Sequence, residues 1–275
     1  MNRKSWCAAA AVMLITLLLM ADSAFAFSTQ VYNWNFKPKE NNEPPTTEPH
    51  YEQLLEKYGG FYIGDTSKKD IYLTFDNGYE NGYTQKVLDV LKEKQVPAAF
   101  FVTGHYMDTE RELIKRMVEE GHIVGNHSYH HPSLPEVDDA RLKRELENLK
   151  NLYTEVTGDS QMQYLRPPRG TFSEKSLALS QQFGYTNVFW SFAYVDWEVN
   201  RQKGWQHAYD SIMRRIHPGA VMLLHSVSSD NAEALPKVID DLRAKGYEFK
   251  SLDHLAVANK VTPFRREEER YGKNE

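Results

Sequence analysis

The feature that most constrains this chain is a repeated alternation of short apolar stretches with longer amphipathic ones between Lys69 and His254. The short stretches are three to five residues long and mostly apolar, as expected for strands covered on both faces. In the amphipathic stretch 232–245, Ala234, Leu235, Val238, Ile239 and Leu242 recur on one helical face. Strands that alternate with helices in this way predict a parallel sheet packed against helices.

The alternation can be written as seven strands separated by six helices. The expected strands are residues 71–75, 98–102, 122–126, 163–165, 187–191, 220–224 and 248–250, and the expected helices are 83–94, 110–120, 138–156, 173–183, 206–216 and 232–245. Gly121, Gly184 and Gly246 stand where helix C-caps are expected. The pattern predicts an α/β fold, a distorted and incomplete (β/α) barrel with about seven parallel strands. A doubly wound open sheet is the alternative.

Short polar motifs directly follow several of the expected strands. They are Thr74-Phe75-Asp76-Asn77-Gly78, His127-Ser128-Tyr129-His130-His131, Arg166-Pro167-Pro168-Arg169-Gly170, Asp196-Trp197 and Leu223-Leu224-His225. In a barrel of parallel strands, the strand C-termini lie on one face, where catalytic groups gather. A carboxylate, two histidines four residues apart, an arginine and a late histidine would meet there, which is typical of a hydrolase.

The two ends of the chain predict further segments. Asn2-Arg3-Lys4, an apolar run and Ala24-Phe25-Ala26 predict a secretory signal peptide over residues 1–26, because the apolar run is short for a membrane span. An uncleaved anchor is the alternative. Cys7 is the sole cysteine, so the mature chain would have no disulfide. Residues 27–68 form a polar, Pro-rich N-terminal extension, and residues 264–275 a charged tail.

The aromatic residues of the extension, Tyr32, Trp34 and Phe36, are expected to pack over the barrel rather than to line a glycan groove. The net charge is −5. The chain has no basic run interleaved with aromatic residues, so nothing indicates a nucleic-acid partner.

The order of the motifs resembles the polysaccharide deacetylase family (carbohydrate esterase family 4), metal-assisted enzymes that remove N-acetyl groups from chitin and peptidoglycan. The resemblance runs from about Lys69 to His254, within a catalytic domain expected over residues 69–263. Residues 74–83, Thr-Phe-Asp-Asn-Gly-Tyr-Glu-Asn-Gly-Tyr, and the run Arg-Pro-Pro-Arg-Gly are most similar to the subgroup that deacetylates muramic acid to form muramic δ-lactam in the bacterial spore cortex.

The resemblance implies a role for the residues that match the motifs. Asp76 would be the general base, His225 the general acid, and His127 with His131 the metal-binding pair. The family's third metal ligand is an aspartate, whereas this chain has Asn77. An amide oxygen is neutral, so we expect either a weak divalent-metal site, with zinc as the expected ion, or no metal and charge stabilisation by backbone donors and Arg166.

The arginine motif carries two cations with different expected roles. Arginine does not lose its proton in ordinary conditions, so Arg166 near Asp76 would keep that carboxylate ionised. Many relatives have an aromatic residue where this chain has Arg169. Arg169 is expected to bind the lactyl carboxylate that muramic acid carries and glucosamine lacks, or else to pair with an acidic surface residue.

The last two motifs predict the wall of the site. Asp196 would pair with Arg166 or with His225, and the sequence leaves both partners open. Trp197 would be a sugar platform or a core residue, and Leu223 would line the space for the acetyl methyl group. Many relatives carry another aspartate where this chain has Ala193.

Together these motifs predict an exported deacetylase whose substrate is N-acetylmuramic acid in peptidoglycan glycan strands, with no stable membrane anchor after cleavage. The alternatives are a deacetylase of chitooligosaccharides or N-acetylglucosamine, and a non-catalytic glycan-binding protein with an eroded metal site. Asn77 and Ala193 favour the last reading, whereas the presence of Asp76, Arg166 and His225 opposes it.

Overall fold

A computed structural model describes residues 27–258 of the chain. The predicted signal peptide and the predicted charged tail lie outside these residues. Along the chain, the strands are β1 (Tyr32–Asn33), β2 (Asp70–Asn77), β3 (Ala98–Val102), β4 (Ile123–Asn126), β5 (Tyr164–Leu165), β6 (Thr171–Phe172), β7 (Thr186–Asn187), β8 (Ala220–Leu224) and β9 (Glu248–Phe249). The helices are α2 (Pro49–Lys57), α3 (Thr84–Lys94), α4 (Gly104–Thr109), α5 (Arg111–Glu119), α6 (Asp139–Thr157), α7 (Glu174–Gln182), α8 (Trp205–Arg215), α9 (Ser229–Ala244) and α10 (Leu252–Ala258).

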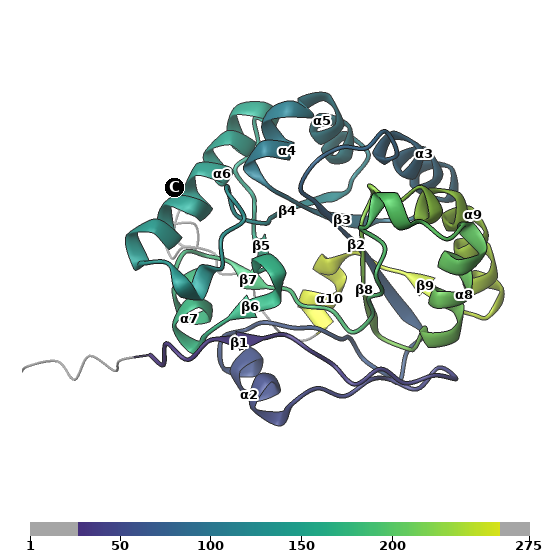
Figure 1. The fold of residues 1–275 in the computed structure, drawn as a ribbon, viewed down its shortest axis with the longest axis horizontal. Coiled ribbons are helices and arrows are strands. Elements are labelled where there is room, and N and C mark those ends of the chain that lie inside the picture. Colours follow the sequence, from purple (N-terminus) through teal and green to yellow (C-terminus); the bar gives the residue numbers. More distant parts are fainter. Residues whose placement is uncertain (1–26, 259–275) are drawn as a thin grey trace, which may run out of the picture.

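Seven strands form one curled parallel sheet, as predicted. Their order is β7-β5-β4-β3-β2-β8, with β9 also paired to β2, and every pairing is parallel. Strands β2, β3, β4, β5 and β7 are neighbours in chain order, and β8 lies beside β2, which is the order of a barrel left open between β7 and β8 and not that of a doubly wound sheet. The sheet therefore forms an incomplete α/β barrel with helices around its outside (Figure 1).

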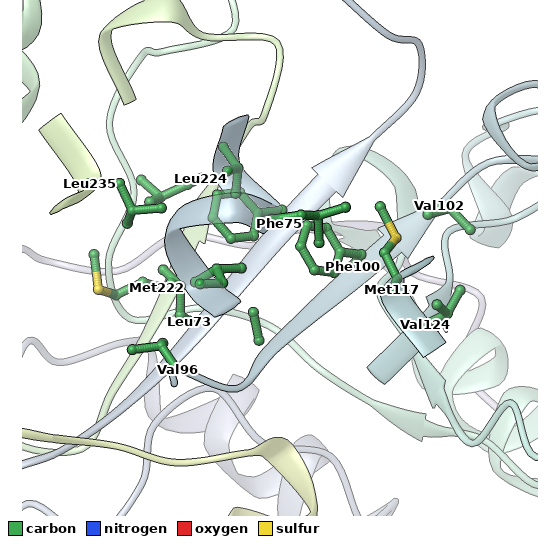
Figure 2. Close-up of a cluster of buried hydrophobic side chains, with 14 of the residues drawn as sticks. Leu73, Phe75, Val96, Phe100, Val102, Met117, Val124, Met222, Leu224 and Leu235 are labelled. Carbon is green, nitrogen blue, oxygen red and sulfur yellow. The ribbon is translucent and has the colours of Figure 1, made fainter. Parts of the chain in front are cut away.

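Alternation along β2 assigns its side chains to two cores. Ile71, Leu73 and Phe75 belong to the large outer core between the sheet and its helices. Figure 2 shows Phe75 and Phe100 side by side in this core, where their rings stack with centroids 5.1 Å apart. Tyr72 belongs instead to the inner core, to which α10 contributes Leu252, Leu255 and Ala256. The inner side of β2 is therefore apolar at its start and leads to Asp76 at its end.

Two segments that are not themselves regular strands lie across the gap between β7 and β8. Phe61 pairs with Val188, and Ile63 pairs with Ala220. Further along, Phe192 pairs with Met222, so the chain leaving β7 runs beside β8. These bridges leave the strand C-termini open and bring the segment after Phe192 next to the end of β8.

The N-terminal extension packs against the body of the fold. β1 pairs antiparallel with β6, and Trp34 lies in a third apolar cluster with Tyr58, Phe172 and Phe189. This agrees with the expectation that Trp34 and Tyr32 pack rather than line a groove. Phe36 is not part of that cluster. The extension therefore supports the turn that precedes β6.

The structure differs from the predicted elements in four places. The expected strand 187–191 is reduced to the two residues of β7, and Val188 pairs only through an isolated bridge. The expected helix 110–120 is preceded by a separate helix, α4, whose Thr103 N-cap accepts from the Tyr106 backbone. The short helix α10 and the pair β1–β6 were not predicted, because two-residue strands and a seven-residue helix carry too little periodicity. Gly121, Gly184 and Gly246 have φ values of 79°, 87° and 81°, which fits helix ends.

No helix within residues 27–258 combines the length and the apolar character needed to span a membrane.

Candidate active site

Polar side chains gather at the C-terminal ends of the parallel strands around a cavity of about 690 Å³. Its lining includes four of the predicted site residues, Asp76, His127, His131 and His225, and a fifth, Trp197, forms part of the wall. The fold therefore brings together residues that are up to 149 positions apart in the chain, because Asp76, His127 and His225 lie at the C-terminal ends of strands of the same sheet.

Asp76 and Arg166 form a buried ion pair beside the cavity. Nη1 of Arg166 donates to Oδ1 of Asp76 across 2.7 Å, and Nε donates to the Val188 carbonyl. The guanidinium also packs on the Phe101 ring, 4.2 Å from its centroid. Burial favours the neutral acid, but the charge of Arg166 outweighs it and lowers the pKa of Asp76. Asp76 is therefore ionised at neutral pH.

The turn after β4 holds two histidines against each other. The rings of His127 and His131 are 4.8 Å apart between centroids. The turn is not helical, because Ser128 and His131 have φ values of 63° and 58°, a left-handed conformation that is unusual outside glycine. Ser128 Oγ accepts from the His131 backbone and closes the turn. His130, at the edge of the same cavity, donates its backbone N–H to Glu145, and its Nδ1 lies 3.0 Å from a Glu145 carboxylate oxygen.

The two histidines have the protonation that metal binding requires. Nδ1 of His127 lies 2.8 Å from the Arg166 carbonyl, which can only accept, so Nδ1 carries the proton and Nε2 presents a lone pair. Nε2 is 3.4 Å from Oδ2 of Asp76. Burial lowers the pKa of His127, and burial together with the neighbouring His127 lowers the pKa of His131 to about 4. Both rings are therefore neutral at neutral pH.

Asn77 lies apart from the cavity lining. As the next residue along β2, it points to the opposite side of the sheet from Asp76. Its Nδ2 donates to Ser226 Oγ across 2.6 Å, and its buried Oδ1 has no hydrogen-bond partner. Among residues 27–258, no group of three or more His, Cys, Asp or Glu side chains could hold a metal ion.

The donors near the cavity nevertheless fit a weakly held divalent cation. His127 and His131 offer neutral imidazole nitrogens at the cavity, whereas the orphaned amide oxygen of Asn77 is an uncharged donor that would have to turn toward them. Such a set carries no ligand charge, so it should bind a metal less tightly than a set with a carboxylate.

His225 is held by Asp196, which settles the partner that the sequence left open. Oδ1 of Asp196 is 2.7 Å from Nδ1 of His225, and Oδ2 accepts from the His225 backbone nitrogen. Because Nδ1 is used in this way, Nε2 is the nitrogen left for the cavity. Burial lowers the pKa of His225, but the Asp196 carboxylate outweighs it and the net shift is upward. Asp196 is 2% exposed and lies behind His225, not in the cavity lining.

Of three other predicted site residues, one lines the cavity and two do not. Trp197 is 48% exposed, and its ring meets the His225 ring edge-on at 5.4 Å. Arg169 is exposed and contributes to the field at His131, but it is not in the cavity lining. Leu223 is buried in β8 and does not line the cavity either.

The structure adds residues that the motifs did not identify. Tyr79 lines the cavity and is 46% exposed. Its place directly after Gly78 could have identified it. Asn231 donates to the Asp196 carboxylate, and the Tyr194 hydroxyl donates to Asn231. No spacing signal in the sequence marks Asn231, because it belongs to the first turn of a helix.

Comparison with known proteins gives concordant results. A family model described as polysaccharide deacetylase matches residues 63–188. The chain is 52% identical over 235 residues to peptidoglycan-N-acetylmuramic acid deacetylase PdaA of Bacillus subtilis, covering 86% of this chain and 89% of that protein. It is 34% identical to a chitooligosaccharide deacetylase of Bradyrhizobium, covering 70% and 93%. The solved structure of Bacillus subtilis PdaA, a family 4 carbohydrate esterase, superposes with a TM-score of 0.82 at 51% identity, covering 84% of this chain and 98% of that one.

Proposed function

The chain belongs to the polysaccharide deacetylase family, and we propose that it hydrolyses the N-acetyl group of N-acetylmuramic acid in peptidoglycan glycan strands. One observation carries the chemistry: two carboxylate pairs, Asp76–Arg166 and Asp196–His225, meet at one cavity with opposite effects on proton affinity. The first supplies a base that stays ionised, and the second supplies an acid whose pKa is raised above that of a free histidine. The similarity to PdaA supports the substrate.

Asp76 acts as the general base. Its carboxylate accepts a proton from a water molecule as the water oxygen forms a bond to the acetamide carbonyl carbon. Arg166 is fully buried and directs Asp76 by holding Oδ1, which leaves Oδ2 for the water. The Asp76–Arg166 ion pair therefore keeps the Asp76 carboxylate ionised and also fixes its orientation.

His225 acts as the general acid. The bond between the carbonyl carbon and nitrogen breaks, and Nε2 of His225 gives its proton to the departing amine, so acetate and a free amino sugar are formed. Asp196 holds the imidazolium through Nδ1 and stabilises its charge. Trp197 packs against the same ring and limits its rotation.

A divalent cation, with zinc as the favoured ion, would be held by His127 and His131, and Asn77 would become a weak third donor by turning from Ser226 toward the cavity. When bound, it would polarise the acetamide carbonyl. Asp76 lies 3.4 Å from Nε2 of His127, so the same carboxylate borders the place where such a cation would be held.

Substrate choice would depend on residues at the rim. Arg169 is exposed beside His131, where it would pair with the lactyl carboxylate of muramic acid. Trp197 offers an exposed aromatic face to a sugar ring. N-acetylglucosamine has no carboxylate for Arg169, so this residue favours the muramic substrate over chitooligosaccharides.

The product has a further consequence. A freed amine on muramic acid can close on the lactyl carboxyl of the same sugar when that carboxyl carries no peptide, and the result is a δ-lactam. We place the enzyme outside the cytoplasm, where its polymer substrate is found, and in the making of spore cortex. The apolar run before Ala26 supports export.

Acetate release from three substrates, intact peptidoglycan, peptide-free glycan strands and chitin oligomers, tests the proposal. Peptide-free glycan strands should release acetate and gain muramic δ-lactam or free muramic amine by mass spectrometry, whereas chitin oligomers should release little. Preferential release from chitin oligomers would favour the chitooligosaccharide alternative. A folded protein that binds glycan and releases no acetate from any of the three, with and without added zinc, would support the non-catalytic reading.

A further inference from the structure

We infer that Asn231 is a positioning residue for His225, acting through Asp196, and that Tyr194 holds Asn231 in its working orientation. The inference rests on the proposed deacetylase function for its kinetic test alone. Asn231 belongs to the first turn of α9 and is 3% exposed, so its side chain must satisfy its polar atoms inside the protein.

All three hydrogen-bonding positions of the Asn231 amide are used. Nδ2 donates to Oδ2 of Asp196 across 2.6 Å and to the His225 carbonyl across 3.2 Å. Oδ1 accepts from the Tyr194 hydroxyl. The amide therefore joins the carboxylate, the backbone of the catalytic histidine and a neighbouring phenol in one network.

The chemistry of the partners permits one orientation of this amide. An ionised carboxylate and a carbonyl oxygen can only accept, so the atom facing Asp196 and the His225 carbonyl must be the nitrogen. Oδ1 is then directed to Tyr194, which can donate. Without the Tyr194 hydroxyl, nothing on that side would oppose a flipped amide, which would place oxygen against the Asp196 carboxylate.

The Asn231 side chain is not needed to begin the helix. Ser228 caps α9 by accepting from the backbone nitrogen of Asn231, and any residue at this position supplies that donor. Two other contacts join the same end of α9 to the chain that follows Trp197. Ser228 donates to the Gln202 side chain, and Asp230 accepts from the Gly204 backbone. The amide of Asn231 is thus free for Asp196.

The expected effect on His225 has a definite sign. When His225 is protonated, its charge compensates Asp196; when His225 is neutral, the buried carboxylate depends more on the Asn231 donor. Removing the donor therefore destabilises the neutral form more and raises the pKa of His225. The other charged or titratable groups that act on His225 are Asp76, Arg166 and His127, and none of them contacts Asn231.

The test compares Asn231→Leu and Tyr194→Phe with the unmodified protein. In Asn231→Leu, the alkaline limb of the kcat profile for acetate release should move up by about one pH unit, and kcat should fall about tenfold with KM little changed, as expected for a lost hydrogen bond to a charged group. Tyr194→Phe should move the limb in the same direction by less. An unmoved limb in a folded Asn231→Leu protein would overturn the inference.

A second readout needs no activity. The imidazole resonance of His225, identified by its loss in His225→Gln, can be titrated by NMR in each protein and should show the same upward shift. If the unmodified protein released no acetate, the proposed function would fail while this titration still decided the role of Asn231. If Asn231→Leu did not fold, an unchanged His225 titration in Tyr194→Phe would refute it.

Asn187 provides a matched control. It is 1% exposed, and its amide donates to Ser180 Oγ, away from the cavity. Asn187→Leu should lower stability as a buried amide replacement does, yet leave the His225 titration unchanged. An equal shift in this control would mean that general loosening, and not the Asn231 contact, moves His225.

Discussion

Arg166 holds the carboxylate of Asp76 at 2.7 Å in a place where the guanidinium itself is fully buried. Two charges removed from water cost free energy that their attraction offsets only while both are present. Because Arg166 reaches Asp76 through one nitrogen and the Val188 carbonyl through another, the arginine also sets the direction of the carboxylate. The same ion pair therefore affects both the stability of the barrel and the ionisation and direction of the Asp76 carboxylate.

Arg166→Met should move the acidic limb of the pH–rate profile upward. Arg166 lowers the pKa of Asp76, and the rate rises with pH as Asp76 loses its proton, so removing the cation shifts that rise to higher pH. Unfolding in urea should also show a loss of about 3–5 kcal/mol, because Asp76 is left buried without its partner. Arg166→Lys keeps a charge and should show a smaller shift. If the acidic limb did not move in folded Arg166→Met, the group that titrates there would not be Asp76.

Asp76→Asn and His225→Ala should each lower kcat by about 10²–10⁴-fold, the usual worth of a positioned general base or acid. Circular dichroism and thermal unfolding would verify that the variants fold. Near-normal turnover in either folded variant would assign the proton transfer elsewhere.

Asn77→Asp should raise the affinity for zinc, because a carboxylate at residue 77 that turned from Ser226 toward the two histidines would give the metal an anionic ligand. Isothermal titration of the two proteins with zinc measures the difference. Ser226→Ala is the matched control, since it removes the hydrogen bond to Nδ2 of Asn77 without adding charge. Equal affinities for the Asp variant and the original protein would place residue 77 outside the metal's ligands.

Arg169→Tyr should weaken action on muramic glycan more than on any N-acetylglucosamine substrate. The lost contact is charge-assisted, and only the muramic sugar carries the carboxylate that forms it. The quantity to compare is the ratio of kcat/KM on the two glycans, before and after substitution. Equal losses on both would make Arg169 a structural residue of its turn.

Gly170→Ala should destabilise the fold by more than a glycine change in open space. Gly170 has φ 67°, and an added Cβ would lie 2.8 Å from the Trp190 ring and 3.0 Å from Cβ of Trp34. The backbone strain alone is about 1–2 kcal/mol. Gly158→Ala, at φ 77° with nothing within 4 Å of the added carbon, carries the strain without the overlap. In chemical denaturation, Gly170→Ala should have a lower free energy of unfolding than Gly158→Ala. Equal free energies of unfolding would show that Trp34 and Trp190 move to make room for the added carbon.

The strand–helix alternation determined the barrel and the face on which its chemistry lies. Runs such as 71–75 and 220–224 are almost entirely apolar, as is typical of strands buried on both sides, and both became strands of the predicted sheet. Because parallel strands end on one face, the positions of Asp76, His127 and His225 directly after such runs already placed them at one cavity.

Tertiary structure alone decided which polar groups touch. Asp196 pairs with His225 and not with Arg166, because the chain after Phe192 runs beside β8, a bridge that carries no local sequence signal. Asn77 turns away from the cavity because adjacent residues of a strand face opposite sides. Side-chain pairing depends on distances between segments far apart in the chain, whereas periodicity reports only each segment's own environment.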